Sequence, residues 1–214
     1  MAKSNWIDIS LPIYTGMIGG PKDPRVEFRL LRDPAKGDPV TMSQVTMSCH
    51  SGTHIDAPLH FFPESAGVDE LPLDTFIGPA QVIEIKDPDA VKSAELKNYD
   101  IRPGDRLLFK TKNSSWVFDG EFFPTPYVSI TIEAAQFLVG KKIKMVGIDY
   151  ITVGGSESRE ANMTVHKIFL DAGIAVMEEV NLKGIRPGRY ELNAVPLRFR
   201  KSDAAPCRVL IRAV

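Results

Sequence analysis

The stretch CHSGTHIDAPLH, residues 49–60, decides most of what this sequence predicts about fold and chemistry. It holds three of the four histidines in the chain, together with one aspartate. Random placement would put only about 0.2 histidines in a window of this length, so the clustering is unusual for this composition. A helix is excluded here, because Gly52 and Pro58 break it and the residue before a proline is pushed towards extended backbone.

The spacing of these side chains predicts a metal site. In extended backbone, side chains two residues apart face the same way, so His54 and Asp56 can converge on one ion. Gly52 lets the chain fold back, so that His50 can join them. Imidazole nitrogen and carboxylate oxygen suit zinc, manganese or iron, and three protein ligands leave the open position of a catalytic site. Isolated histidines are more often packing residues, but this density of potential ligands is difficult to explain by packing.

The fourth histidine allows a second metal position. His166 falls on a predicted helix, and Glu178 ends a predicted strand beside Glu179. A helix followed by a strand can return both groups to one edge of a domain, where they would complete a second metal position with Asp56 as the bridge. Paired metal ions activate a water molecule between them. Spacing alone does not decide between two alternatives. One is this second metal site; the other is a buried His166 with Glu178 and Glu179 as a solvated pair.

Apolar runs separated by turn signals predict the elements around the cluster. We expect strands at 80–85, 106–110, 145–148, 174–178 and 208–212, and helices at 131–139 and 161–172. Residues 186–200 indicate a strand with a charged outer face. Because strands outnumber helices and their order is mixed, the sequence predicts one strand-rich α/β domain over residues 1–214.

The region before the cluster combines turn formers with an alternating segment. Val45, Met47 and Cys49 point one way and His50 the other, which predicts a half-buried strand that delivers His50 on its polar face. Cys49 then faces the core and is not a ligand. The first forty residues are rich in turn formers, especially at 16–24 and 33–39, and predict a long ordered arm or loop that lines a site.

Composition argues against several classes of protein. Hydrophobic residues make up 43% and charged residues 25% of the chain, as in ordinary globular proteins. A net charge of -1 lacks the basic excess of a nucleic-acid binder. The apolar runs are far shorter than the ~20 residues of a membrane span, and no export core follows Met1. For Cys49 and Cys207 we expect two buried thiols in a reducing cytoplasm, with a single disulfide as the alternative.

The cluster resembles the signature of a known family. The pattern His-x-Gly-Thr-His-x-Asp-x-Pro-x-His, residues 50–60, is that of the cyclase-like metal-dependent hydrolases, which include bacterial kynurenine formamidase and isatin hydrolase. Weaker landmarks of the same family are the segments PGDRLL at 103–108, VGID at 146–149 and LNAVPL at 192–197. The resemblance therefore extends over most of the chain.

The resemblance implies a fold, a ligand set and an assembly. The fold would be a swivelling β/β/α-type domain with a central mixed sheet, and the assembly a homodimer or homotetramer. One or two divalent ions would bind, zinc in most members and manganese in isatin hydrolase. The first ion would be held by His50, His54 and Asp56, and the second by Asp56, His166 and Glu178. His60 matches the general acid/base of the family.

The resemblance also implies amide hydrolysis by metal-activated water, of the arylformamidase kind found in tryptophan catabolism. The alternatives are lactam or lactone ring opening, or a cyclase, on the same site. A non-catalytic metal-binding protein is the alternative of another class, and it would have no use for His60 beside the ligands. The partner would be a small amide or lactam, with Phe61 and Phe62 as candidate pocket walls. Residues 17–23 lack the tryptophan that related formamidases carry there.

Overall fold

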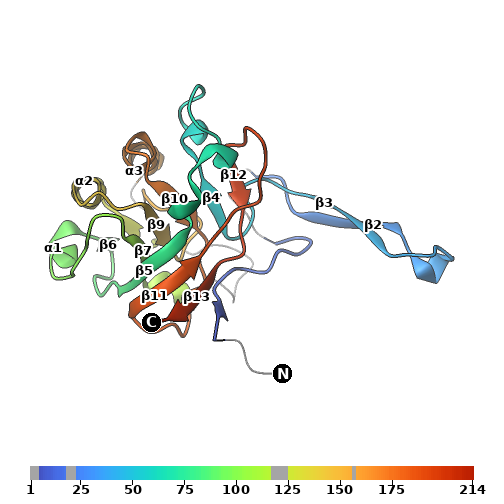
Figure 1. Cartoon of the computed structure of the whole chain (residues 1–214), viewed down its shortest axis with the longest axis horizontal. Coiled ribbons are helices and arrows are strands. Elements are labelled where there is room, and N and C mark those ends of the chain that lie inside the picture. The colour runs from blue at the N-terminus through green and yellow to red at the C-terminus, as the bar shows by residue number, and fades with distance from the viewer. Residues whose placement is uncertain (1–4, 18–22, 117–124, 156–157) are drawn as a thin grey trace.

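A nine-stranded mixed sheet forms the centre of the fold in the computed structural model, which describes residues 5–17, 23–116, 125–155 and 158–214 (Figure 1). The four strands at its centre are parallel and their outer neighbours are antiparallel. In order across the sheet these strands are β1 (Ile7–Asp8), β13 (Leu210–Ala213), β11 (Gly188–Asn193), β5 (Ile77–Glu84), β7 (Arg106–Lys110), β9 (Met145–Ile148), β10 (Ala175–Glu178), β4 (His54–Asp56) and β12 (Ala204–Pro206).

Two hydrophobic clusters cover the two faces of this sheet. Leu107 and Phe109 of β7 join the cluster under the helices, whereas Leu108 between them belongs to the cluster on the other face. Parallel strands that are buried on both faces have continuous runs of apolar residues in the sequence. The prediction for β7 and β9 therefore matches the structure at both ends, and the predicted strand-rich mixed α/β class is confirmed.

The helices α1 (Ser93–Leu96), α2 (Ile132–Gly140) and α3 (Arg159–Asp171) lie together on one side of the sheet (Figure 1). Thr131 and Ser158 cap α2 and α3 by accepting hydrogen bonds from backbone N–H groups of the first turn. The predicted helices are confirmed with shifts of one or two residues at their ends. The face of α3 turned to the sheet buries Val165, His166 and Phe169, so His166 points inward.

A hairpin of β2 (Glu27–Arg32) and β3 (Met42–Thr46) projects from the body, with a short 3-10 helix (Pro34–Lys36) at its tip (Figure 1). Every residue of both strands is exposed. The predicted half-buried strand leading to His50 is therefore wrong, because β3 pairs only with β2 and ends before His50, which lies in a turn. The predicted arm exists, but it contains the strand β2.

Other differences from the predicted elements follow from interactions between distant segments. The strand expected over 186–200 is confined to β11, and the chain then leaves the sheet. The sequence predicts neither the short elements β12 and α1 nor the two-stranded sheet of β6 (Ala90–Val91) and β8 (Ser129–Ile130). Strands β5, β10 and β13 lie within three residues of the predicted limits.

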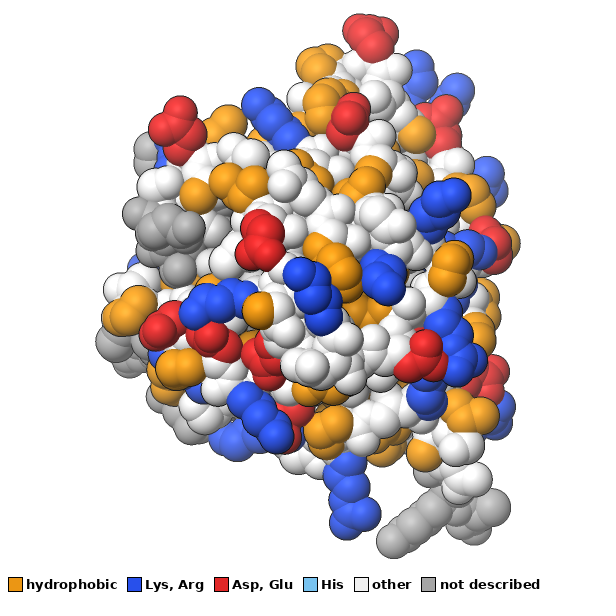
Figure 2. Space-filling view, turned by 90° about the vertical axis from the view of Figure 1, so that its left-hand side faces the viewer, with side chains coloured by type: hydrophobic (Ala, Val, Ile, Leu, Met, Phe, Trp, Pro, Cys, Tyr) orange, Lys and Arg blue, Asp and Glu red, His pale blue; other side chains and the backbone are white. Residues whose placement is uncertain are grey.

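The surface over the helices carries charges of both signs. Figure 2 shows Lys and Arg side chains interspersed with Asp and Glu on this face, without a basic stripe. Among the helices of the described residues, none is long and apolar enough to cross a membrane.

Candidate metal centre

Strand β4 carries two of the predicted ligands. It lies between β10 and β12 and pairs antiparallel with both. In this register Glu178 of β10 is opposite His54, and Ala204 of β12 is opposite Asp56. His54 and Asp56 face the same side because they are two residues apart in extended backbone. The sheet therefore brings the end of β10 to the two ligands of β4.

A turn before β4 returns His50 to this strand. Gly52 has a φ of 66°, and a Cβ at this position would lie 3.0 Å from Cγ1 of Ile13. Such a conformation favours glycine. It places His50 Nδ1 3.0 Å from Asp56 Oδ1, while His54 Nε2 lies 3.4 Å from the same oxygen. The three residues form the first of two donor groups that share Asp56, as the sequence predicts.

The second group forms on the other oxygen of Asp56. His166 Nε2, from α3, lies 3.7 Å from Asp56 Oδ2 and 2.9 Å from Glu178 Oε1. Within each group the candidate ligand atoms lie within 4.8 Å of one another. The structure thus brings all five predicted ligand positions together around Asp56.

The buried atoms of this cluster fit a divalent transition metal. His54 Nε2 and both carboxylate oxygens of Asp56 are buried and have no hydrogen-bond partner among the described residues. Leaving such groups unsatisfied is costly. His54 Nδ1 donates to the carbonyl of Gly52 at 2.8 Å, and His166 Nδ1 donates to that of Asn162 at 2.9 Å. In the neutral imidazoles that ligation requires, these bonds leave both Nε2 lone pairs directed towards the centre, the usual arrangement of metal-binding histidines.

Electrostatics couple this cluster to protons. Burial acts to raise the pKa of Asp56, but contacts with His50 and His54 outweigh it and hold that pKa well below its usual range. Burial likewise opposes charge on His50, yet the contacts with Asp56 raise its pKa to about 9. The pKa of His166 is also raised, since Glu178 outweighs its burial. Because metal ligation needs neutral imidazole, an ion entering this cluster would displace protons.

His60 lies beside the two donor groups that share Asp56 and belongs to neither, but it forms a third group of candidate ligands with His50 and Asp203. It ends a 3-10 helix (Pro58–His60), and its ring centroid is 4.4 Å from that of His50 and 6.2 Å from that of His166. Burial lowers the pKa of His60; the charge of Asp56 opposes this, and the charges of His50 and His166 lower it further. Its imidazole is therefore neutral at pH 7 and able to accept a proton.

Phe61 and Phe62, the candidate pocket walls, pack against the core, and Phe61 also packs against histidines of the cluster. The ring of Phe61 packs against His60 at 4.6 Å and against His166 at 5.4 Å between centroids. Both Phe61 and Phe62 are partly buried against the core under the helices. Phe61 therefore supports two histidines of the cluster. Of residues 17–23, the segment that lacks the tryptophan of related formamidases, residues 18–22 lie outside the described residues.

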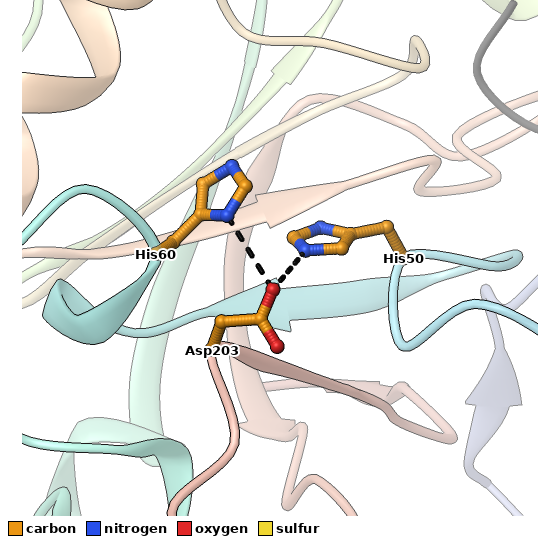
Figure 3. A group of neighbouring side chains, drawn as sticks. All are labelled: His50, His60 and Asp203. Atoms are coloured by element: carbon orange, nitrogen blue, oxygen red, sulfur yellow. Dashed lines mark hydrogen bonds and ion pairs between the residues drawn. The ribbon is translucent and has the colours of Figure 1, made fainter. Parts of the chain in front are cut away.

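Sequence reasoning missed Asp203. Its Oδ2 lies 2.9 Å from His50 Nε2 and 3.6 Å from His60 Nδ1 (Figure 3). Burial acts to raise the pKa of Asp203. The hydrogen bond from His50 and the positive charge of His50 outweigh burial, so the pKa of Asp203 is lowered overall. No motif surrounds Asp203 in the sequence. Only the pairing of β12 with β4 brings it here, so the sequence held no local signal.

Both Glu178 and Glu179 are buried, so the alternative of a solvated glutamate pair is wrong. Glu178 and Glu179 are only 4% and 2% exposed. Burial raises the pKa of Glu179 to about 7.

The thiols of Cys49 and Cys207 are free, as expected, but Cys49 is only half-buried and contacts Ser202.

A mixed α/β sheet with two histidine–carboxylate groups sharing one buried aspartate is the arrangement of a metal-dependent hydrolase. Comparison with known proteins defines the family. The model of the family described as "Putative cyclase" matches residues 7–154. The chain belongs to this Cyclase family, so the resemblance read from residues 50–60 is confirmed.

Individual relatives match along nearly the whole chain. Kynurenine formamidase of Bacillus cytotoxicus is 32% identical over 99% of both chains, and that of Bacillus cereus is 31% identical over all of both. The structure of a predicted metal-dependent hydrolase from Bacillus stearothermophilus has a TM-score of 0.81 and 33% identity, covering 96% of this chain and 97% of that one. Isatin hydrolase A of Ralstonia solanacearum has a TM-score of 0.83 at 21% identity, covering 98% of this chain and 92% of its own, and shows the shared fold.

Proposed function

We propose that this chain hydrolyses the formamide bond of N-formylkynurenine, as a metal-dependent amidohydrolase. The observation that carries the proposal is the convergence of His50, His54, His166 and Glu178 on the two oxygens of buried Asp56. Full-length similarity to kynurenine formamidases supports the formamide as substrate.

One or two divalent ions would complete this centre. His50, His54 and Asp56 would hold the first, and Asp56 would share the second with His166 and Glu178. We propose zinc, with manganese as the alternative, because imidazole and carboxylate donors suit both. When bound, the ions lower the pKa of a water molecule and polarise the amide carbonyl.

His60 would move the proton in this reaction. It stands beside the donor groups, is partly exposed, and is neutral at pH 7 because its pKa is lowered. It would accept a proton from the attacking water and deliver it to the leaving nitrogen. Phe61 would hold the His60 ring in place through the edge contact at 4.6 Å. A protein that only binds metal would have no need of such a group.

The test compares substrates on metal-replete enzyme. We expect kcat/KM for N-formylkynurenine above ~10⁴ M⁻¹s⁻¹, the lower end for good enzymes. Isatin and a panel of small lactams and lactones serve as competitors. A value far below that limit, together with faster opening of a ring substrate, would overturn the formamidase assignment and select ring opening.

We further propose that the enzyme is a homodimer, because the projecting hairpin has two unlike faces. The cross-strand pairs Phe28–Val45 and Leu30–Ser43 place Phe28, Leu30 and Val45 on one face. These three side chains are 45–52% exposed. The residues between them are polar and form the opposite face, namely Glu27, Arg29, Gln44 and Thr46.

The body of the same chain offers a complementary surface. An open, largely apolar groove of about 750 Å³ is lined by Leu11, Pro12, Ile13 and Leu197, among others. An isolated two-stranded hairpin is at best marginally stable in water. Closed two-fold symmetry would let each hairpin cover the groove of the other copy. The oligomeric state in solution tests this, with a homotetramer as the alternative outcome.

Two further assignments complete the proposal. Residues 1–214 would act as one catalytic domain, which is supported by the pairing of β1 with β13 at one edge of the sheet. A cytoplasmic location is supported by the two free thiols, Cys49 and Cys207.

A further inference from the structure

Asp203 contacts two histidines of the centre with a single carboxylate oxygen. Oδ2 lies 2.9 Å from His50 Nε2 and 3.6 Å from His60 Nδ1. Figure 3 shows the carboxylate between the two imidazole rings, at the start of the segment that leads into β12. Since His50 has its other nitrogen 3.0 Å from Asp56, Asp203 faces the side of that ring turned away from the donor groups.

This contact completes a pattern among the three candidate ligand histidines. In His54 and His166 the nitrogen turned away from the centre donates to a backbone carbonyl, that of Gly52 and that of Asn162. In His50 the corresponding nitrogen meets a carboxylate instead. A carboxylate partner fixes the tautomer and the ring orientation of a ligand histidine, and it makes the imidazole more basic.

The backbone holds Asp203 in this position. Its carbonyl accepts a hydrogen bond from the N–H of Ala57 at 2.8 Å, and the next residue, Ala204, pairs with Asp56. Ser202 Oγ donates to the carbonyl of Ala204 at 2.7 Å. The strand that carries Asp56 therefore also fixes the backbone of Asp203, although the two aspartates are far apart in the sequence.

We propose that Asp203 is a positioning residue that sets the tautomers of His50 and His60 together. Accepting from His50 Nε2–H leaves the Nδ1 lone pair free for an ion that His54 and Asp56 would also hold. His60 Nδ1 lies 3.6 Å from the same oxygen of Asp203, just beyond hydrogen-bond distance. The negative charge of that oxygen favours a proton on Nδ1, which leaves Nε2 as the atom that exchanges a proton with substrate. The part concerning His60 rests on the proposed hydrolase function; the part concerning His50 rests on metal binding alone.

Two variants of Asp203 and one control test this assignment. Asp203→Leu replaces both acceptor oxygens by methyl groups on the same branched skeleton, whereas Asp203→Asn is isosteric and keeps one neutral acceptor. Asp69→Asn is the matched control, because Asp69 accepts from the backbone of nearby Lys201 at 2.9 Å. In competition with a chelator, we expect zinc affinity to fall roughly 10- to 100-fold in Asp203→Leu and less in Asp203→Asn. Asp69→Asn should stay within about twofold of wild type.

Histidine tautomers provide a readout that a merely structural role would not change. In two-bond ¹H–¹⁵N spectra of the zinc-loaded protein, His60 should be the Nδ1–H tautomer in wild type and in Asp69→Asn. Asp203→Leu should convert it towards Nε2–H. Its kcat should also fall more for amides with poor leaving groups than for activated esters, with KM little changed.

Three results would overturn the assignment. One is unchanged zinc affinity and unchanged tautomers in Asp203→Leu. Another is a change of the same size in Asp69→Asn. The third is loss of one whole equivalent of metal, which would make Asp203 a ligand. Because affinity and tautomers are measured without substrate, they test Asp203 even if wild type fails to hydrolyse formamides.

Discussion

Removing metal with a chelator should make the stability of the folded chain decrease steeply as the pH rises from 7 to 9. In the stripped protein the buried carboxylates face imidazoles, and protonated imidazoles balance their charge. The contacts with Asp56 raise the pKa of His50 from 6.5 to about 9, against the effect of burial. A folded-state pKa above the unfolded one contributes stability that is present below pH 6.5 and lost as the pH rises through 9.

The size of this loss follows from the shift. At about 1.4 kcal/mol per pKa unit, His50 alone contributes about 3 kcal/mol to the free energy of unfolding. The raised pKa values of His54 and His166 act in the same direction. The lowered pKa of His60 and the raised pKa of Glu179, about 7, act mainly below pH 7. Burial raises the pKa of the Cys207 thiol, which reduces stability further only near and above pH 9.

Urea unfolding between pH 6.5 and 9, with chelator or with saturating zinc, measures the effect. The stripped protein should lose about 3 kcal/mol or more over this range. In His50→Gln, the loss in the free energy of unfolding over the same pH range should be smaller by about 3 kcal/mol. Stabilisation by zinc should increase with pH, since ligation requires deprotonated imidazoles. A flat profile for the stripped protein, or equal slopes in wild type and His50→Gln, would refute this account of the cluster.

Other variants test separate parts of the structure. His54→Ala should lose metal and activity together, whereas His60→Ala should keep its metal by elemental analysis while kcat falls roughly 10²–10⁴-fold; an empty site in His60→Ala would make it a ligand. Gly52→Ala should cost about 1–2 kcal/mol in urea unfolding and weaken zinc binding, because the left-handed backbone and the close approach of Ile13 both oppose a Cβ; unchanged stability would contradict this. Phe28→Glu should convert dimer to monomer in light scattering, with Arg29→Glu on the opposite hairpin face as the control that remains dimeric.

Sequence alone predicts the local parts of this protein. Strands β7 and β9 are continuous apolar runs between turn signals, and a strand buried on both faces has this pattern. Alternation within residues 54–56 and the need for Gly52 to turn the chain identify the first donor group without further information. For His166 and Glu178 the sequence leaves two alternatives open, because helix and strand periodicity give direction but not distance.

The remaining parts depend on contacts between distant segments. The alternation at Val45 is that of a strand with unlike faces, but only the structure shows that β3 lies in a projecting hairpin and that its apolar face is exposed. Asp203 reaches His50 only because β12 pairs with β4, and no pattern around Asp203 encodes that register. Long-range pairing of this kind is set by the whole sheet, so short motifs do not reveal it.

Stepwise return of zinc to the stripped protein, with hydrolysis of N-formylkynurenine followed at each step, tests the central claim most directly. We predict negligible hydrolysis without metal and activity that increases in proportion to bound zinc. The increase should stop at one or two equivalents per chain, with kcat/KM then above ~10⁴ M⁻¹s⁻¹. A chain that binds neither zinc nor manganese, or that hydrolyses the formamide equally well without metal, would contradict the account.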